Sequence, residues 1–285
     1  MQERLGMALT INTNLSALIV QKNLSAATVS LNSAIERMTT GYKINHAKDD
    51  AAGYSIAANW TAKISSLDIA SENASMGLDM LKTAEENYSL ITEHLQRVRD
   101  LTEQAANGTY GADSKAAIKS EITARLSEID RISATAEFNG IALMSGTGTA
   151  RILQVGIDKT ANSKIVLTAD LFAGADSTKL LGKAAAAFAA DCTTTSADQL
   201  EKIDTAIKTI STRVTSIGAA QNRVESAISA ISVQSENLTS SLSTIKDADV
   251  AQESSSYIKA QILQQASATL LATANQLPSI ALNLL

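Results

Sequence analysis

The sequence predicts a mainly α-helical protein: a long antiparallel coiled-coil helical bundle, formed by pairing of the N- and C-terminal segments, with a small β-hairpin region in the middle. Three observations predict it. Apolar residues recur at alternating steps of three and four over two long stretches, aromatic residues make up only 3% of the chain, and the single proline is Pro278. Helices can therefore run long without interruption, and alanine and aliphatic side chains suit closely packed helices.

The clearest repeat lies in the C-terminal half. Alternating steps of three and four meet fourteen positions, of which only Gln221 and Ser235 are polar: Leu200, Ile203, Ile207, Ile210, Val214, Ile217, Gln221, Val224, Ile228, Ile231, Ser235, Leu238, Leu242 and Ile245. This spacing predicts a helix roughly 70 Å long with one narrow apolar stripe. Such a stripe needs a partner helix of similar length.

The first half supplies that partner. The same stepping meets Trp60, Ile64, Leu67, Ser71, Ala74, Leu78 and Leu81, then, after one shortened step, Ala84, Tyr88, Ile91, Leu95, Val98, Leu101 and Ala105. The shortened step is a stammer, which overwinds a coiled coil locally without ending the helix. Residues 107–111 (NGTYG) break it.

A third helix and a short sheet are predicted next. Asp113 suits an N-cap, and one helical face then carries Ile118, Ile122, Leu126 and Ile129. Helical periodicity disappears between residues 140 and 195, where residues 152–157 and 165–167 read as two short strands joined by a polar loop.

Apolar residues also line helical faces at both termini. They include Leu15, Leu18, Ile19 and Ile35 near the start, and Ile258, Ile262, Leu270, Leu277 and Leu284 near the end. Residues 16–29 carry one charge, Lys22, and residues 261–285 carry none. Uncharged apolar helices do not stay exposed as a soluble surface. We expect the two ends to bury each other, or to bury against neighbouring copies.

Several function classes lack support. The net charge is −5 with no basic run, which argues against nucleic acid as a partner. No apolar stretch is long enough to cross a membrane, and no secretory signal peptide is recognisable. The histidines, His46 and His94, lack metal-ligand spacing, and the lone Cys192 cannot form a metal cluster. No phosphate-binding loop or nucleophile elbow occurs, so we expect neither an enzyme nor a cofactor.

Two pairs of aspartates could serve either acid–base catalysis or helix capping. Asp49 with Asp50 precedes the first long helix, and Asp247 with Asp249 precedes the last one. Carboxylates at helix starts accept hydrogen bonds from free N–H groups and complement the helix dipole, so capping is favoured over acid–base catalysis. Gln221, within the apolar stripe, is expected to set the register of the paired helices.

Short motifs flank these helices in a characteristic order. They are INTN at 11–14, TTGYKIN at 39–45, HAKDDAAG at 46–53, EFNG at 137–140, AAQNRVE at 219–225, KDAD at 246–249, QILQQA at 261–266 and ANQLP at 274–278, with LL at the end. Together they resemble bacterial flagellin, over roughly residues 7–156 and 204–285. The residues carrying the motifs are Gly41, Asn45, Asp49, Asp50, Gly53, Asn139, Gly140, Gln221, Asn222, Arg223, Asp247 and Asp249.

The resemblance implies a structural subunit that assembles into the extracellular flagellar filament and is exported by the flagellar type III apparatus. Residues 7–44 with 247–285 would form the inner-tube layer, 45–150 with 198–246 the helical rod, and 151–197 a short variable outer segment. The implied partners are further copies of the chain, an export chaperone at the C-terminal helix, the filament cap and the hook-associated proteins.

A second resemblance concerns one exposed face. Residues 95–101 (LQRVRDL) look like the flagellin stretch recognised by toll-like receptor 5, with Gln96, Arg97, Leu101, Gln104 and Glu121 at the matching positions. Leu101 falls on the apolar stripe, whereas Arg97 and Gln104, seven apart, share an outward face. The alternative interpretation of the arginines is an ordinary solvated surface.

Three departures and two alternatives accompany the resemblance. Residues 1–6 precede the methionine at which flagellins usually begin, Lys43 stands where the family usually has arginine, and Thr244 stands where an arginine commonly precedes the Asp-Ala-Asp motif. A hook–filament junction protein shares the terminal pattern. A signalling coiled coil shares the long helices, but it would have a tight-turn tip and a membrane span.

Overall fold

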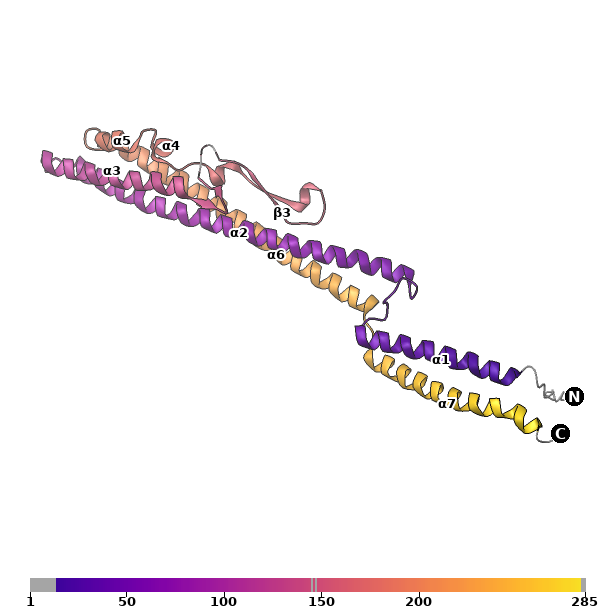
Figure 1. Cartoon of the computed structure of the whole chain (residues 1–285). Coiled ribbons are helices and arrows are strands. Elements are labelled where there is room, and N and C mark those ends of the chain that lie inside the picture. Colours follow the sequence, from indigo (N-terminus) through magenta and orange to yellow (C-terminus); the bar gives the residue numbers. More distant parts are fainter. Residues whose placement is uncertain (1–13, 145, 147, 283–285) are drawn as a thin grey trace. The chain divides into compact units, whose positions relative to one another are not determined.

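The computed structural model describes residues 14–282 except 145 and 147, and side chains as far as residue 276. The described chain forms two compact units: the terminal unit, up to residue 62 and from residue 238, and the central unit, residues 63–237. The helices are α1 (Leu15–Thr40), α2 (Ala51–Ala106), α3 (Ala112–Thr135), α4 (Ser177–Leu181), α5 (Ala185–Cys192), α6 (Ser196–Lys246) and α7 (Val250–Leu282), with short 3-10 turns at Ala161–Ser163 and Ala169–Phe172 (Figure 1).

The long helices α2 and α6 pair antiparallel in the central unit (Figure 1). Polar contacts between them step down α6 as they step up α2, at Glu85–Gln221, Tyr88–Arg213 and Arg99–Asp204. All fourteen predicted stripe positions on each helix are buried or partly buried. The predicted coiled-coil pairing is confirmed, and it buries Leu81, Ile91, Leu95 and Val98 completely.

Helix α3 packs on this pair through the predicted face. Ile118, Ile122, Leu126 and Ile129 are buried. The predicted cap is wrong: the N-cap is Gly111, which makes no side-chain capping bond, and Asp113 lies within the first turn. There its carboxylate still favours the positive end of the helix dipole.

Two small antiparallel hairpins follow α3. Strands β1 (Glu137–Phe138) and β2 (Ile141–Ala142) flank Asn139 and Gly140, whose φ angles are 49° and 74°. Asn-Gly is the preferred pair for a hairpin turn with two positive φ angles, so the EFNG motif encodes this turn. The predicted strand pair is also present, as β3 (Arg151–Gln154) and β4 (Lys164–Leu167), with Leu153 opposite Ile165.

The middle segment contains helices that the sequence analysis missed. Helices α4 and α5 pack on α3 and form a small core from Leu171, Phe172, Leu181, Phe188, Ala189 and Cys192. The sequence analysis assigned no helix between residues 140 and 195, but two short helices lie there. Helices of 5 and 8 residues are too short to display a repeat, and the alanine run obscures which face of α5 is buried.

Polar contacts bind the middle segment to helices α2, α3 and α6. The hydroxyl of Tyr88 donates to the carbonyl of Ala173 at 2.8 Å, and Asp130 of α3 accepts from both the N–H and the hydroxyl of Ser177. Arg213 lies over the Tyr88 ring, 5.8 Å from its centre. Burial raises the pKa of Tyr88, so its hydroxyl stays protonated and able to donate.

A pair of leucines on α2 tests the stripe. Leu95 is fully buried and Leu90 is 45% exposed. Leu95→Ala leaves a cavity between packed helices and should lower the free energy of unfolding by about 2–5 kcal/mol. Leu90→Ala should change it by less than about 1 kcal/mol. Urea unfolding of the monomer, followed by circular dichroism, measures both, and equal effects would contradict the assigned stripe.

Candidate assembly surface

Helices α1 and α7 form an antiparallel pair (Figure 1), and the most buried residues of their contact face are small. The buried positions are Ala27 and Ala34 on α1, and Ala260, Ser267 and Ala274 on α7. Neighbouring members are seven residues apart on each helix, which is the heptad spacing of a coiled-coil stripe. Small side chains let the two helices approach closely, but each alanine contributes only about 0.8 kcal/mol of burial.

Polar contacts along this face set the register of the two helices. They are Asn14 Nδ2 to the Ala274 carbonyl at 2.7 Å, Gln264 Nε2 to Thr28 Oγ1 at 3.1 Å and Arg37 to Glu253 at 3.1 Å. Asn14 also caps α1, since its side-chain oxygen accepts from the Ala17 N–H. The INTN motif therefore begins a helix and binds it to its partner through one side chain.

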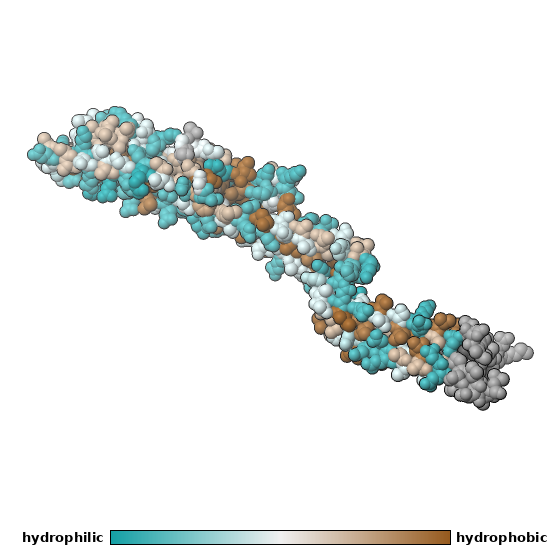
Figure 2. Space-filling view, in the orientation of Figure 1, coloured by the Kyte–Doolittle hydropathy of each residue, from teal (hydrophilic) through white to brown (hydrophobic). Residues whose placement is uncertain are grey.

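Many large aliphatic side chains of both helices point away from this contact, whereas Val20, Leu24, Leu31 and Leu271 are partly buried. Exposed residues are Leu15, Leu18, Ile19, Val29 and Ile35 on α1, and Val250, Ile258, Ile262, Leu263 and Leu270 on α7, with exposed fractions of 44–65%. Figure 2 shows hydrophobic surface distributed over the pair. We call these ten residues the outer face. Leu277 and Leu284, also predicted for assembly, lie outside the residues whose side chains are described.

The apolar side chains of the outer face are not buried within the single chain. Fully burying one leucine or isoleucine contributes about 1.5–3 kcal/mol. Apolar patches of this extent on a soluble chain mark a site of protein–protein contact. The expectation that the two ends bury each other is therefore confirmed only for their small residues, and the large ones remain open to other molecules.

The segments joining α1 to α2 and α6 to α7 pair with each other inside the terminal unit. Tyr42 and Asp247 form an antiparallel bridge, flanked by Lys43 N–H to the Lys246 carbonyl and Ala248 N–H to the Gly41 carbonyl, both 2.8 Å. The Lys246 ammonium lies 4.0 Å from the centre of the Tyr42 ring. We call this arrangement the linker clasp. It explains the position of Gly41 and Asp247 within the motifs.

Carboxylates of the acidic pairs cap the elements around the clasp. Asp50 precedes α2 and accepts from the Gly53 N–H, and Asp249 precedes α7 and accepts from the N–H groups of Ala251 and Gln252. A Cβ at Gly53 would lie 2.5 Å from Asp50 Oδ2, so any other residue there would displace the capping carboxylate. The prediction that Asp247 also caps a helix is wrong: it follows the end of α6 and pairs through its backbone.

Asp49 caps the loop before α2 rather than the helix itself. Its Oδ2 accepts from the N–H groups of Asn45 and His46, at 3.2 and 3.0 Å. The hydrogen bond from His46 is the largest cause holding the pKa of Asp49 below its ordinary value of 3.8. Asn45 also donates to the Tyr42 carbonyl, so the motif residues form one continuous network.

The stretch that resembles the receptor-recognised one lies on α2 beside α3. Arg97 donates to Glu121 Oε1 at 3.0 and 2.9 Å, and Gln104 donates to the Tyr110 hydroxyl at 2.8 Å. Gln96, Arg97 and Gln104 are exposed, as expected. Leu101 is only 2% exposed and packs in the α2–α6 stripe, so it cannot present its side chain to another protein.

The QNR motif combines a buried contact with an exposed one. Gln221 donates to Glu85 Oε2 at 2.7 Å in a part-buried contact across the α2–α6 pair, and its role in setting the register stays a prediction. Asn222 and Arg223 are exposed and line a groove between α6 and the β3–β4 hairpin.

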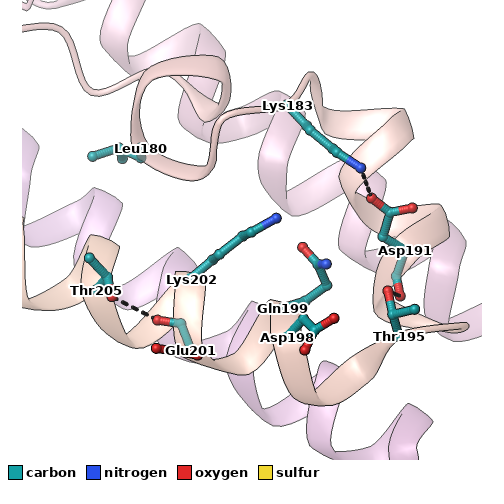
Figure 3. A pocket seen from close by; sticks show the side chains of 9 residues that line it. All are labelled: Leu180, Lys183, Asp191, Thr195, Asp198, Gln199, Glu201, Lys202 and Thr205. Atoms are coloured by element: carbon teal, nitrogen blue, oxygen red, sulfur yellow. Dashed lines mark hydrogen bonds and ion pairs between the residues drawn. The ribbon is translucent and has the colours of Figure 1, made fainter.

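A further hollow of about 750 Å³ lies between the end of α4, α5 and the start of α6 (Figure 3). It is lined by Leu180, Lys183, Asp191, Thr195, Asp198, Gln199, Glu201, Lys202 and Thr205. Lys183 pairs with Asp191, whereas the buried Gln199 Oε1 has no hydrogen-bond partner among the described residues. Lysines and carboxylates dominate the lining of this hollow, which includes neither histidine nor cysteine.

The histidine and cysteine side chains outside this hollow are the remaining candidates for reactive groups. His46 is exposed, 2.8 Å from Glu36, and Cys192 is buried, which raises the pKa of its thiol and keeps it protonated. Within the described residues, no group of three or more His, Cys, Asp or Glu side chains is placed to hold a metal ion. No described helix is apolar over a length that would span a membrane.

Sequence reasoning missed the contacts that join α1 to α7. Asn14, Arg37 and Glu253 were not singled out, although each makes a contact between the helices. The motif position of Asn14, directly before an apolar helix, is a recognisable capping pattern. Nothing in the sequence pairs Arg37 with a residue 216 positions away.

Comparison with known proteins places this geometry in a family. Residues 11–149 match the bacterial flagellin N-terminal helical region, and residues 200–285 match the bacterial flagellin C-terminal helical region. The chain is 33% identical to flagellin FlaB2 of Treponema pallidum, over 96% of this chain and 99% of that one, and 36% identical to the flagellin of Xenorhabdus nematophila, over 98% and 100%. A putative flagellar hook-associated protein from Vibrio parahaemolyticus has a similar fold, with a TM-score of 0.59 at 15% identity, over 70% of this chain and all of that one.

Acid should loosen the linker clasp through Asp49. Because the folded-state pKa of Asp49 is lowered, its contribution is present above pH 3.8 and is lost as pH falls below 3.8 through the folded-state pKa. The amide resonances of Asn45 and His46 should shift in that range. Asp49→Asn keeps an accepting oxygen at every pH, so both shifts should vanish in this variant. Unchanged titration in Asp49→Asn would contradict the assignment.

Proposed function

Because this chain belongs to the bacterial flagellin family, we propose that it builds the flagellar filament by burying the outer face of its α1–α7 pair against neighbouring copies. Flagellins are structural proteins rather than enzymes, and the chain is a structural subunit of the flagellar filament. The observation that carries the proposed mechanism is the arrangement of the pair, with small residues inside and ten large aliphatic residues outside.

Assembly through this face couples folding to polymerisation. An alanine contact buries too little apolar area to hold two long helices together firmly in water. Neighbouring copies add the burial that the outer face lacks, so the pair becomes rigid as the subunit joins the filament. We further propose, as the resemblance to flagellin implies, that α1 and α7 form an inner-tube layer, residues 45–150 with 198–246 a rod layer, and residues 151–197 the outermost segment.

The exposed C-terminal helix also bears on export. The proposed route out of the cell is the flagellar type III apparatus, as the resemblance to flagellin implies. Until export, the uncharged stretch from residue 261 requires cover, and an export chaperone that binds α7 in an apolar groove would provide it. At the filament end, the cap and the hook-associated proteins would meet the same terminal helices.

A hook–filament junction protein is the second candidate. The fold similarity to a putative hook-associated protein favours it, but at 15% identity that similarity concerns the fold alone. Near full-length identity above 30% to proteins named flagellin supports the filament subunit instead. Quantitative mass spectrometry of isolated flagella separates the two, because a filament subunit is present in large excess over a junction protein.

Serine substitutions on α7 test the assembly face. Ile262→Ser with Leu270→Ser removes apolar area from the outer face and should abolish elongation of filament seeds, measured by light scattering and electron microscopy. Gln265→Ser with Thr269→Ser, at exposed polar positions of the same helix, should elongate like the parent chain. Removal of residues 261–285 should leave a folded central unit that does not polymerise. A truncated chain that still formed filaments would overturn the proposal.

We also propose that the Arg97–Glu121 surface on free subunits is recognised by toll-like receptor 5. The support is the exposed charged face formed by Gln96, Arg97 and Gln104, together with the resemblance of residues 95–101. In the proposed filament this rod surface would be covered by neighbouring subunits, so a receptor would meet it on monomers.

Two substitutions separate recognition from folding. Arg97→Ala should weaken receptor binding about tenfold or more without changing the unfolding midpoint, since exposed ion pairs contribute little to stability. Leu101→Ala should lower the unfolding free energy by about 2–5 kcal/mol, and its binding defect should follow the unfolded fraction. Surface plasmon resonance and urea unfolding measure the two effects. Full receptor binding by Arg97→Ala would exclude this surface.

A further inference from the structure

Two patches of the central unit are complementary to each other. The acidic patch consists of Asp68, Ile69, Glu72 and Met76 on α2. The basic patch consists of Ile152, Lys164, Val166 and Arg223, from the β3–β4 hairpin and α6. We propose that the acidic patch of one copy docks on the basic patch of a second copy. This inference rests on the proposed function as a filament subunit and assigns one contact between its subunits.

The acidic patch is a short, continuous strip on one face of α2. Asp68, Glu72 and Met76 are four residues apart and so lie side by side along the helix. Ile69 and Met76 are 54% and 53% exposed. A shallow hollow of about 490 Å³ along this strip is lined by α2 side chains alone, so no other described element covers it.

The basic patch forms where the hairpin meets α6. Ile152 lies opposite Val166 in the strand register, on the face away from the inward-pointing Leu153 and Ile165. Lys164, two residues before Val166, shares that outward face because side chains alternate along a strand. Lys164 and Arg223 also line a groove of about 600 Å³ between the hairpin and α6.

The charged members of both patches lack partners within the described residues. Asp68, Glu72, Lys164 and Arg223 take part in none of the ion pairs there, whereas Arg37, Arg97, Arg99 and Arg131 each pair with a carboxylate. The two hollows share no lining residue. The patches therefore do not satisfy each other within one chain.

A second copy is the occupant that fits both patches at once. Each patch offers two like charges and two large apolar side chains, with the signs opposite between them. Two different, mutually complementary patches on one chain produce a head-to-tail contact, which repeats into an open helical assembly instead of closing as a dimer. Apolar contact supplies burial there, and the charges select the register and orientation.

Charge reversal tests the contact. Lys164→Glu with Arg223→Glu places like charges together and should raise the critical concentration for seeded elongation about tenfold, and Asp68→Lys with Glu72→Lys should do the same. The chain with all four reversals restores opposite signs and should return close to the parent value. Lys179→Glu with Lys202→Glu, at exposed lysines of α4 and α6 away from both patches, is the charge-matched control and should elongate like the parent.

The outcomes are distinct. A parent chain that never polymerises would overturn the proposed function itself. If the parent polymerises, two results would overturn only the patch contact. The first is that both double reversals have the same critical concentration as the control. The second is that the fourfold variant shows no recovery, which is also expected if another acidic protein occupied the basic patch. If the fourfold variant melts below the parent, an equimolar mixture of the two double variants provides the same comparison, because each then offers the charge that the other needs.

Discussion

The apolar stripe shared by α2 and α6 is the constraint on which the rest of the structure depends. These helices, 56 and 51 residues long, come from opposite halves of the sequence, so their pairing joins the two halves of the chain. Other elements attach to that pair at defined points. Arg97 binds α3 through Glu121, Gln221 of α6 binds Glu85 of α2, and Tyr88 holds the middle segment through the Ala173 carbonyl.

The two helix pairs of this chain differ in how much apolar surface they bury within a single copy. The α2–α6 stripe encloses leucine, isoleucine and tyrosine, so much of its hydrophobic burial is achieved within one copy. The α1–α7 stripe fully buries only alanine and serine, leaves Leu24, Leu31 and Leu271 partly exposed and turns ten other large aliphatic residues outward. Since large aliphatic side chains provide most of the burial free energy, the second pair is completed only by contact with other molecules. A stable rod together with a terminal pair that lacks burial suits a subunit that polymerises.

Much of the fold was predictable because the pairing of the long helices follows from a local repeat of apolar residues. A step of three and four sustained from Leu200 to Ile245 specifies one buried face, and the structure buries that face. Helices α4 and α5 were missed because so few residues display no repeat, and the cap at Asp113 was wrong because the chain turns at Gly111. The outward aliphatic residues of α1 and α7 were recognised. Their inward alanines, and the contact between Arg37 and Glu253, depend on how two distant helices meet, which no local pattern encodes.

The central claim is that neighbouring copies cover the outer face. A cryo-electron microscopy reconstruction of filaments assembled from this chain tests it most directly. The account predicts that Leu18, Ile258 and Ile262, each more than half exposed in the single chain, are buried against other subunits, while Ala27 and Ala260 keep their mutual contact face. A filament in which those aliphatic side chains face water, with the subunits joined through other surfaces, would contradict the account.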